Sequence, residues 1–93
     1  TAWGVDTERG GSHAGLAETS QMLAVRPDLV REHAYEPGHV GPYNREQMFK
    51  GGIKGVSANG ILGDPTGGST AEIGEALLDA LSDRLTAVVQ ERQ

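Results

Sequence analysis

The sequence has no cysteine, so neither a disulfide framework nor a thiolate metal site can be built from it. Large aromatic side chains are also scarce, with one tryptophan, two tyrosines and one phenylalanine among 93 residues. Glycine, by contrast, occurs 14 times, about twice its average usage. A self-contained domain of this size usually carries more large apolar side chains. A loop-rich small domain would fit this composition, but we favour the interpretation that the chain is part of a larger fold.

Clusters of positive charge and long hydrophobic runs are missing as well. The eight lysines and arginines are scattered and the net charge is -5, which argues against a nucleic-acid partner. No stretch approaches the ~20 apolar residues of a membrane span. Residues 1–4 show no basic region followed by an apolar run, so no signal peptide is recognisable. We therefore expect a cytoplasmic protein. The chain begins without a methionine, so we expect that the initiator was trimmed, that the chain starts at a processing site or that it is a fragment.

The first two thirds of the chain predict short elements separated by turns. Residues 1–15 are glycine-rich and read as a loop, in which Trp3 and Val5 end a short strand. A helix is expected over residues 16–25, followed by an irregular stretch over 31–44. The remaining expectations are a helical turn over 45–50, a short strand over 53–56 and a turn at 59–60.

The last segment gives the clearest prediction, an amphipathic helix over residues 70–91. Residues 69–72 (STAE) have the form of a capping box, with Ser69 as the capping residue. Apolar residues then recur every three or four positions at Ile73, Leu77, Leu81, Leu85 and Val88, and Gly74 interrupts the helix only mildly. Such a wide apolar stripe needs a surface to cover, and this chain supplies little sheet for it.

The histidines are the residues best suited to chemistry. No two of them have the i, i+4 spacing of a helical metal site, so we predict that this chain contributes no metal ligands. For His33 and His39, a solvated or locally hydrogen-bonded side chain is the favoured interpretation. His13 lies in a loop with small neighbours that let a substrate approach closely. Histidine is also the residue type best placed for proton transfer near neutral pH.

Two other features suggest chemistry on a first inspection. The loop at residues 63–68 precedes a helix N-terminus, which is a ready anion site. However, it lacks the Gly-Lys-Ser/Thr ending of a phosphate loop, and Asp64 would repel phosphate. Thr1 could act as an N-terminal nucleophile activated by its own amine. A hydrolase that uses Thr1 as its nucleophile therefore remains an alternative function. A second alternative is that the chain is a non-catalytic binding or regulatory subunit.

Two blocks of sequence resemble the creatininase family. Residues 12–30 (SHAGLAETSQMLAVRPDLV) are similar to its pattern H-[AG]-G-x-x-E-T-S-x-M-L followed by P-x-x-V. Residues 52–66 (GIKGVSANGILGDPT) resemble the family's late G-x-x-G-D-P segment. The mycofactocin-associated peptidase branch of the family has a similar late segment. The blocks occur in the family order. The resemblance implies a three-layer α/β/α fold around a mainly parallel sheet.

In this resemblance, residues 1–93 form the C-terminal part of a single domain. They comprise a glycine-rich active-site loop region (1–15), a helix with an irregular segment and short strand (16–68), and the C-terminal helix (69–93). The family hydrolyses amide C–N bonds, often in cyclic amides, with a two-metal centre of zinc or manganese. Its ligands lie in an E-x-H-G segment and other positions that are absent here. The resemblance therefore implies an N-terminal segment or second chain that carries the metals.

The resemblance also assigns roles to individual residues. His13 matches the catalytic histidine, which relays a proton to the leaving nitrogen, and Glu18 matches a supporting glutamate. Ser12, a second candidate supporting residue, stands where some members have an acidic residue, and Trp3 does not match the spacing of the substrate-lining tryptophans. We therefore expect one chain of an oligomeric metal-dependent amidohydrolase acting on a small amide.

Overall fold

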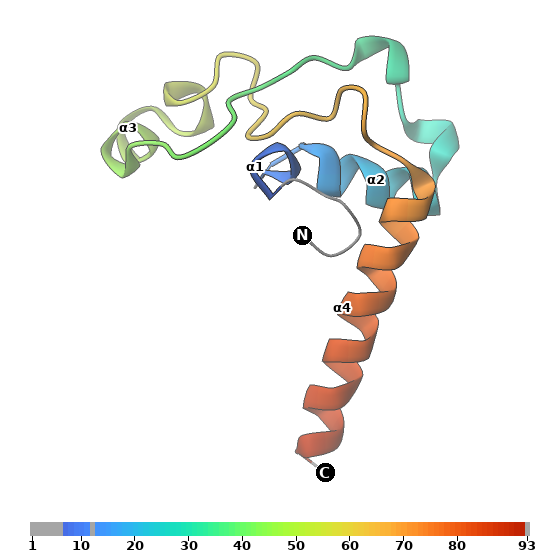
Figure 1. Cartoon of the computed structure of the whole chain (residues 1–93). Helices are drawn as coiled ribbons and strands as arrows, with labels where there is room; N and C mark the ends of the chain where they lie inside the picture. The colour runs from blue at the N-terminus through green and yellow to red at the C-terminus, as the bar shows by residue number, and fades with distance from the viewer. Residues whose placement is uncertain (1–6, 12, 93) are drawn as a thin grey trace.

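The computed structural model describes residues 7–11 and 13–92 (Figure 1). Thr1, Trp3, Val5 and Ser12 lie outside the described residues. The described part consists of helices joined by long loops. In chain order they are α1 (Thr7–Gly10), α2 (Leu16–Val25), the 3₁₀ turns η2 (Pro27–Leu29) and η3 (Glu32–Ala34), α3 (Arg45–Gly51), η4 (Ile53–Gly55) and α4 (Ala71–Glu91).

The expected sheet does not appear within the described ranges, where β pairing is limited to isolated bridges from Leu62 to His13 and to His39. The prediction of a strand over residues 53–56 is wrong. Instead, Ile53–Gly55 form the 3₁₀ turn η4, whose carbonyl at Ile53 accepts the amides of Val56 and Ser57. An isolated apolar run satisfies its backbone locally when no neighbouring strand offers partners. The N-terminal loop likewise contains a helical turn, α1, that the glycine-rich composition did not predict.

The predictions for the helices are confirmed. The helix expected over 16–25 is α2, and the one expected over 70–91 is α4, which begins at Ala71 and ends at Glu91. The capping residue was predicted wrongly, because the Thr70 hydroxyl, and not that of Ser69, accepts the Ile73 amide at 3.1 Å. Ser69 donates its hydroxyl to the Pro65 carbonyl and so closes the preceding loop.

Helices α2 and α4 pack closely at one point near the N-terminus of α4. Ser20 is completely buried there, and its hydroxyl accepts the Thr70 amide at 3.1 Å. Gly74 faces the same turn of α2, and a Cβ atom on it would lie 1.9 Å from the Ser20 carbonyl oxygen. The sequence suggested only that Gly74 mildly interrupts the helix. In the structure, Gly74 is the point at which the two helix backbones meet.

Most of α4 extends away from the rest of the molecule (Figure 1). Leu81, Leu85 and Val89 are 58%, 65% and 51% exposed and recur at four-residue spacing on its distal half. The apolar stripe predicted from the sequence is thus largely uncovered along this half. No helix in the described ranges is long and apolar enough to cross a membrane.

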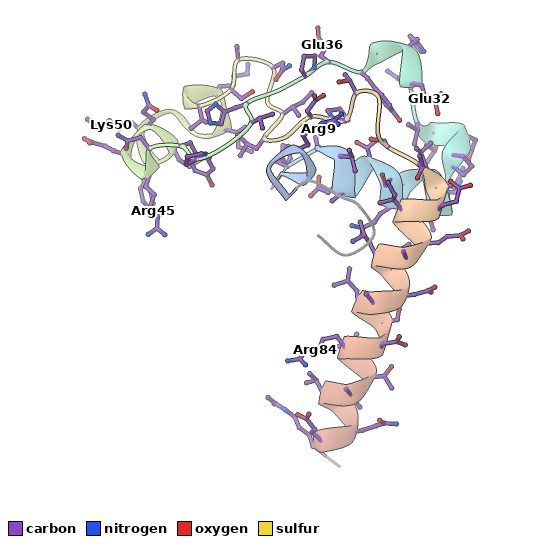
Figure 2. All side chains as sticks on the ribbon, viewed as in Figure 1. Arg9, Glu32, Glu36, Arg45, Lys50 and Arg84 are labelled. Atoms are coloured by element: carbon purple, nitrogen blue, oxygen red, sulfur yellow. The ribbon has the colours of Figure 1, made fainter. Side chains whose placement is uncertain are left out.

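Positively charged side chains are spread over separate elements. Figure 2 shows Arg45 and Lys50 on α3 far from Arg84 on α4, while Arg9 lies against the central loops. Lys50 is paired with Glu46 at 2.9 Å, and Arg26 with Asp28 at 2.8 Å. This dispersed arrangement matches the scattered positions of the basic residues in the sequence.

Candidate active-site loop

The loop between α1 and α2 carries His13 and is joined to a distant loop by paired backbone hydrogen bonds. The His13 amide donates to the Leu62 carbonyl at 3.3 Å, and the Leu62 amide donates to the His13 carbonyl at 2.8 Å. The His13 side chain is exposed, while Leu62 is buried at 5% exposure. The two blocks that resemble the creatininase family thus meet at this pair of residues, where the His13 side chain is exposed.

A third segment lies on the other side of Leu62. The His39 amide donates to the Ile61 carbonyl at 3.0 Å, and the Gly63 amide donates to the His39 carbonyl at 2.8 Å. The His39 ring hydrogen-bonds through Nε2 with the Pro42 carbonyl at 2.9 Å and meets Tyr43 edge-on. This local hydrogen bond agrees with the interpretation of His39 from the sequence. His33 is exposed on η3.

An ion pair also connects the two loops. Arg9 approaches Asp64 with 3.5 Å between Nε and Oδ2, and it donates to the Thr66 carbonyl. The Asp64 amide in turn donates to the Arg9 carbonyl at 2.8 Å. The hydroxyl and amide of Thr66 donate to the Asp64 carboxylate. Asp64 therefore organises its own turn and links that turn to the loop of His13.

Acid should weaken this link. The Thr66 hydroxyl, helped by the Thr66 amide and the Arg9 charge, holds the pKa of Asp64 below its ordinary value against the opposing effect of burial. A carboxylate with a lowered pKa stabilises the fold above its unfolded pKa, about 3.9 for Asp, and this contribution is lost as pH falls through the folded pKa. We expect Asp64→Asn to flatten the dependence of the denaturation midpoint on pH as the pH falls below about 4, the unfolded pKa of Asp.

Asp28→Asn is the matched control for this experiment. Asp28 also has a lowered pKa, through its hydrogen bonds from Arg26, but that pair is exposed and close in sequence. Exposed pairs are screened by solvent and contribute little to stability. An equal flattening in both variants would contradict a special role for Asp64.

Close backbone approach explains a glycine in the His13 loop. Gly11 has φ of +65°, and a Cβ atom on it would lie 1.7 Å from the Leu62 carbonyl oxygen. A side chain here would therefore collide with the backbone that pairs with His13. The glycine-rich composition of the loop reflects this packing as well as conformational freedom.

Glu18 supports the backbone directly after His13. Its Oε2 accepts the Ala14 amide at 2.6 Å, which resembles the returning glutamate of a capping box at the start of α2. Ala14 has φ of +55°, a region that residues with a Cβ rarely occupy. The pattern H-[AG]-G also allows glycine at this position, and glycine adopts that backbone conformation without steric cost. The supporting contact of Glu18 is therefore to the backbone of the loop.

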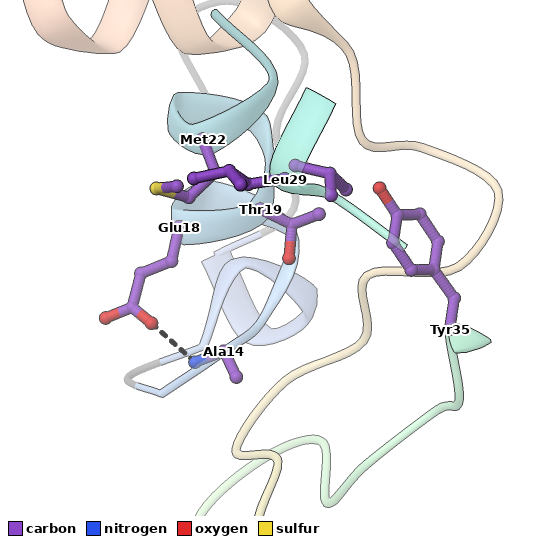
Figure 3. Close-up of a pocket in the computed structure, with 7 residues that line it drawn as sticks. Ala14, Glu18, Thr19, Met22, Leu29 and Tyr35 are labelled. Carbon is purple, nitrogen blue, oxygen red and sulfur yellow. Dashed lines mark hydrogen bonds between the residues drawn. The ribbon is translucent and has the colours of Figure 1, made fainter. Parts of the chain in front are cut away.

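A pocket of about 310 Å³ opens beside this loop (Figure 3). Its walls are mainly apolar, and its lining includes Glu18, Thr19 and Ala14, which directly follows His13 in the chain. The hydroxyl oxygen of Tyr35 is buried, and it has no hydrogen-bond partner in the described part of the chain. The remaining lining residues are Met22, Leu29 and Val30.

Comparison with known proteins decides the family. The family model described as creatinine amidohydrolase matches residues 1–89, which is nearly the whole chain. The chain belongs to the creatininase family. The resemblance of the two sequence blocks is thereby confirmed, and the family implies an α/β fold of which the described residues show a helical part.

Curated relatives of this creatininase-family chain carry a common name. Mycofactocin precursor peptide peptidase of Mycobacterium tuberculosis (strain H37Rv) is 38% identical over 76 residues, covering 80% of this chain and 30% of the relative. The protein of the same name from Mycolicibacterium smegmatis is 37% identical over 79 residues, covering 80% and 32%. The chain thus spans about a third of the length of these relatives. No solved structure matches it.

The metal centre implied by the family does not fit the residues described here. Nowhere in ranges 7–11 and 13–92 do three or more His, Asp or Glu side chains come together as a candidate ligand set. The Nε2 atom of His39 is already engaged by the Pro42 carbonyl. The placement of the ligands outside this chain stays a prediction.

Sequence reasoning missed several residues of this region. Neither Arg9 nor Tyr35 was assigned a role from the sequence. Opposite charges in two glycine-rich loops, at Arg9 and Asp64, were a signal that could have suggested their pairing. Nothing in the sequence indicates the approach of His39 to Leu62, because that contact is made by backbone atoms.

Proposed function

We propose that this chain is the C-terminal part of a metal-dependent amidohydrolase and that His13 is its proton relay. The observation that carries the proposal is the family match over residues 1–89, which includes the H-[AG]-G-x-x-E-T-S block around His13. The substrate is an amide with a scissile C–N bond, in a cyclic amide or a peptide. The names of the mycobacterial relatives favour the peptide.

The loop geometry suits the transfer of a proton to a departing nitrogen. An amide nitrogen is a poor leaving group until it is protonated, so hydrolysis needs a donor beside the breaking bond. His13 is exposed, and its backbone is held on one side by Leu62 and on the following residue by Glu18. This support fixes the start of the side chain while the ring stays accessible. When bound, the family's zinc or manganese ions would polarise the carbonyl.

In this proposal, the metal ligands come from an N-terminal segment or second chain that also covers α4. Leu81, Leu85 and Val89 form an exposed row on the part of α4 that extends from the rest of the molecule. Burying one such side chain contributes about 1.5–3 kcal/mol. A creatininase-family fold is α/β, so a sheet is the surface of the right kind for this row.

Substitution on this row should block assembly. We expect Leu85→Asp to abolish the complex of this chain with its E-x-H-G-containing partner, because a charge would be buried without a counterion. Ala87→Asp is the matched control, since Ala87 is exposed and lies about 200° around the helix from Leu85. Native mass spectrometry of the co-expressed proteins measures both the complex and its metal content.

The same measurement tests the division of labour. We expect the assembled complex to retain its metal ions and the 93-residue chain alone to bind none tightly. One or two tightly held ions on the isolated chain would contradict the proposal. So would an active complex formed by the Leu85→Asp variant.

A further inference from the structure

Asn59 is followed directly by Gly60, and this pairing leaves the asparagine side chain open to attack by the backbone. Glycine has no Cβ atom to obstruct the approach of its nitrogen, and its backbone adopts unusual conformations at low cost. Asparagine is also one of the residue types that thermostable proteins avoid as thermolabile. The chain has one other asparagine, Asn44, which is followed by the bulky Arg45. A backbone attack on an asparagine side chain is therefore expected at Asn59 before Asn44.

This reaction is deamidation, the loss of ammonia from the side chain. The Gly60 nitrogen forms a bond to Asn59 Cγ and gives up its proton, while the bond from Cγ to Nδ2 breaks. The departing NH2 group takes up a proton and leaves as ammonia, and a five-membered succinimide ring remains. One water molecule then opens the ring at either carbonyl. The product is aspartate or isoaspartate at position 59.

The folded loop engages both groups that react. The Gly60 amide donates to the Ser57 carbonyl at 3.1 Å. Asn59 Nδ2 donates to the Pro37 carbonyl at 3.0 Å. Ring closure removes the Gly60 proton and expels Nδ2, so it destroys both of these hydrogen bonds. The fold therefore opposes the reaction although the Asn59 side chain is exposed.

Two further hydrogen bonds hold the Asn59 carboxamide in place. Its Oδ1 accepts the Ser57 hydroxyl at 2.9 Å and the Ile61 amide at 3.1 Å. The side chain thus connects residue 37 with residue 61, beside Leu62, whose backbone pairs with that of His13. Aspartate or isoaspartate would lack the Nδ2 donor and would place a negative charge near the Pro37 carbonyl. Deamidation would therefore break the connection to residue 37.

We infer that Asn59 is a modification site, at which deamidation is fast in the unfolded chain and is slowed by the hydrogen bonds of the folded loop. A chain that has spent time unfolded acquires a negative charge at position 59. It also loses one of the contacts that join the segments around Leu62. The modification therefore records unfolding of this loop in the covalent structure of the chain.

The two asparagines provide an internal control for the experiment. The protein in its native assembly and the same protein in urea are incubated at mildly alkaline pH and then digested with trypsin. Residues 32–45 and 55–84 are released as peptides, and each contains one asparagine and no glutamine. In urea, mass spectrometry should show conversion of Asn59 faster than that of Asn44. In the native assembly, conversion of Asn59 should be at least about tenfold slower than in urea, because two hydrogen bonds have to be lost.

Ser57→Ala tests whether the loop contacts cause the protection. It removes the hydroxyl that donates to Asn59 Oδ1 and leaves the backbone carbonyl that accepts the Gly60 amide. In the native assembly, conversion of Asn59 should become roughly three- to tenfold faster, the usual effect of losing one hydrogen bond. Ser69→Ala is the matched control, because its hydroxyl donates to the Pro65 carbonyl and does not contact Asn59. That variant should convert at the parent rate.

Each result decides a separate part of the inference. Equal rates in urea and in the native assembly would overturn the protection. Conversion of Asn59 in urea that is no faster than that of Asn44 would overturn the site itself. A parent-like rate in Ser57→Ala, or equal acceleration in Ser69→Ala, would overturn the role of the loop contacts. None of these measurements uses amide hydrolysis by the enzyme, so the inference stands or fails independently of the proposed function.

Discussion

Gly74→Ala is expected to destabilise the protein, although alanine is the better helix former. Removing glycine from a helix interior contributes up to about 1 kcal/mol of stability. Here, however, the new Cβ would lie 1.9 Å from the Ser20 carbonyl oxygen and 2.9 Å from the Gln21 nitrogen, which are backbone atoms that no rotamer change can move. Overpacking typically costs about 1–3 kcal/mol. Because the 1.9 Å contact places the cost at the upper end of this range, we expect a net loss of about 2 kcal/mol for the assembled protein once the helix gain is subtracted.

The mechanism of this loss predicts a second effect. Separating the helices to make room for the added methyl group would also stretch the 3.1 Å hydrogen bond from the Thr70 amide to the Ser20 hydroxyl. That amide lies at the start of α4, where helical amides have no partner within the helix. The variant should therefore lose protection from hydrogen exchange at the start of α4 as well as stability.

Gly51→Ala is the matched control for Gly74→Ala. Gly51 is the last residue of α3, and a Cβ atom on it would meet nothing within 4 Å. The same chemical change should therefore be neutral or slightly stabilising there. Denaturation midpoints followed by circular dichroism compare the two variants. A Gly74→Ala protein as stable as the parent would show that the helices are not held at this separation.

The sequence predicted the helices well because their determinants are local. The apolar period of residues 73–88 and the polar start at 69–72 give both the position and the apolar face of α4. The strand at 53–56 failed because strand formation depends on a partner that lies elsewhere. The same limit applies to the α/β architecture, which the family implies and the described residues, being helical, do not display.

The candidate site was predicted in part, and for a similar reason. The motif around His13 could be recognised residue by residue, and the supporting position of Glu18 came with it. The bridge from His13 to Leu62 uses only backbone atoms, which carry no sequence signature across 49 positions. The pocket near Tyr35 depends on how three segments fold around α2, which periodicity does not encode.

His13→Ala carries the largest expected effect on activity. General acid–base catalysis typically contributes about 10²–10⁴ in rate, and the exposed imidazole of His13 is the group assigned to it. We expect kcat of the assembled enzyme to fall by this factor while metal content is unchanged. His33→Ala is the matched control, since His33 is also exposed but lies on η3, outside both matching blocks.

Turnover and metal content together separate the possible roles of His13. Full activity in His13→Ala would remove its catalytic assignment. Loss of metal along with activity would make His13 a ligand and would end the proposed division between this chain and its partner. Thr1→Ala tests the alternative nucleophile, and inactivity in that variant alone would transfer the chemistry to Thr1. A proton relay requires a specific pattern: His13→Ala is slow but keeps its metal, while His33→Ala and Thr1→Ala stay active. The reason is that removing a relay slows bond cleavage without emptying the metal site.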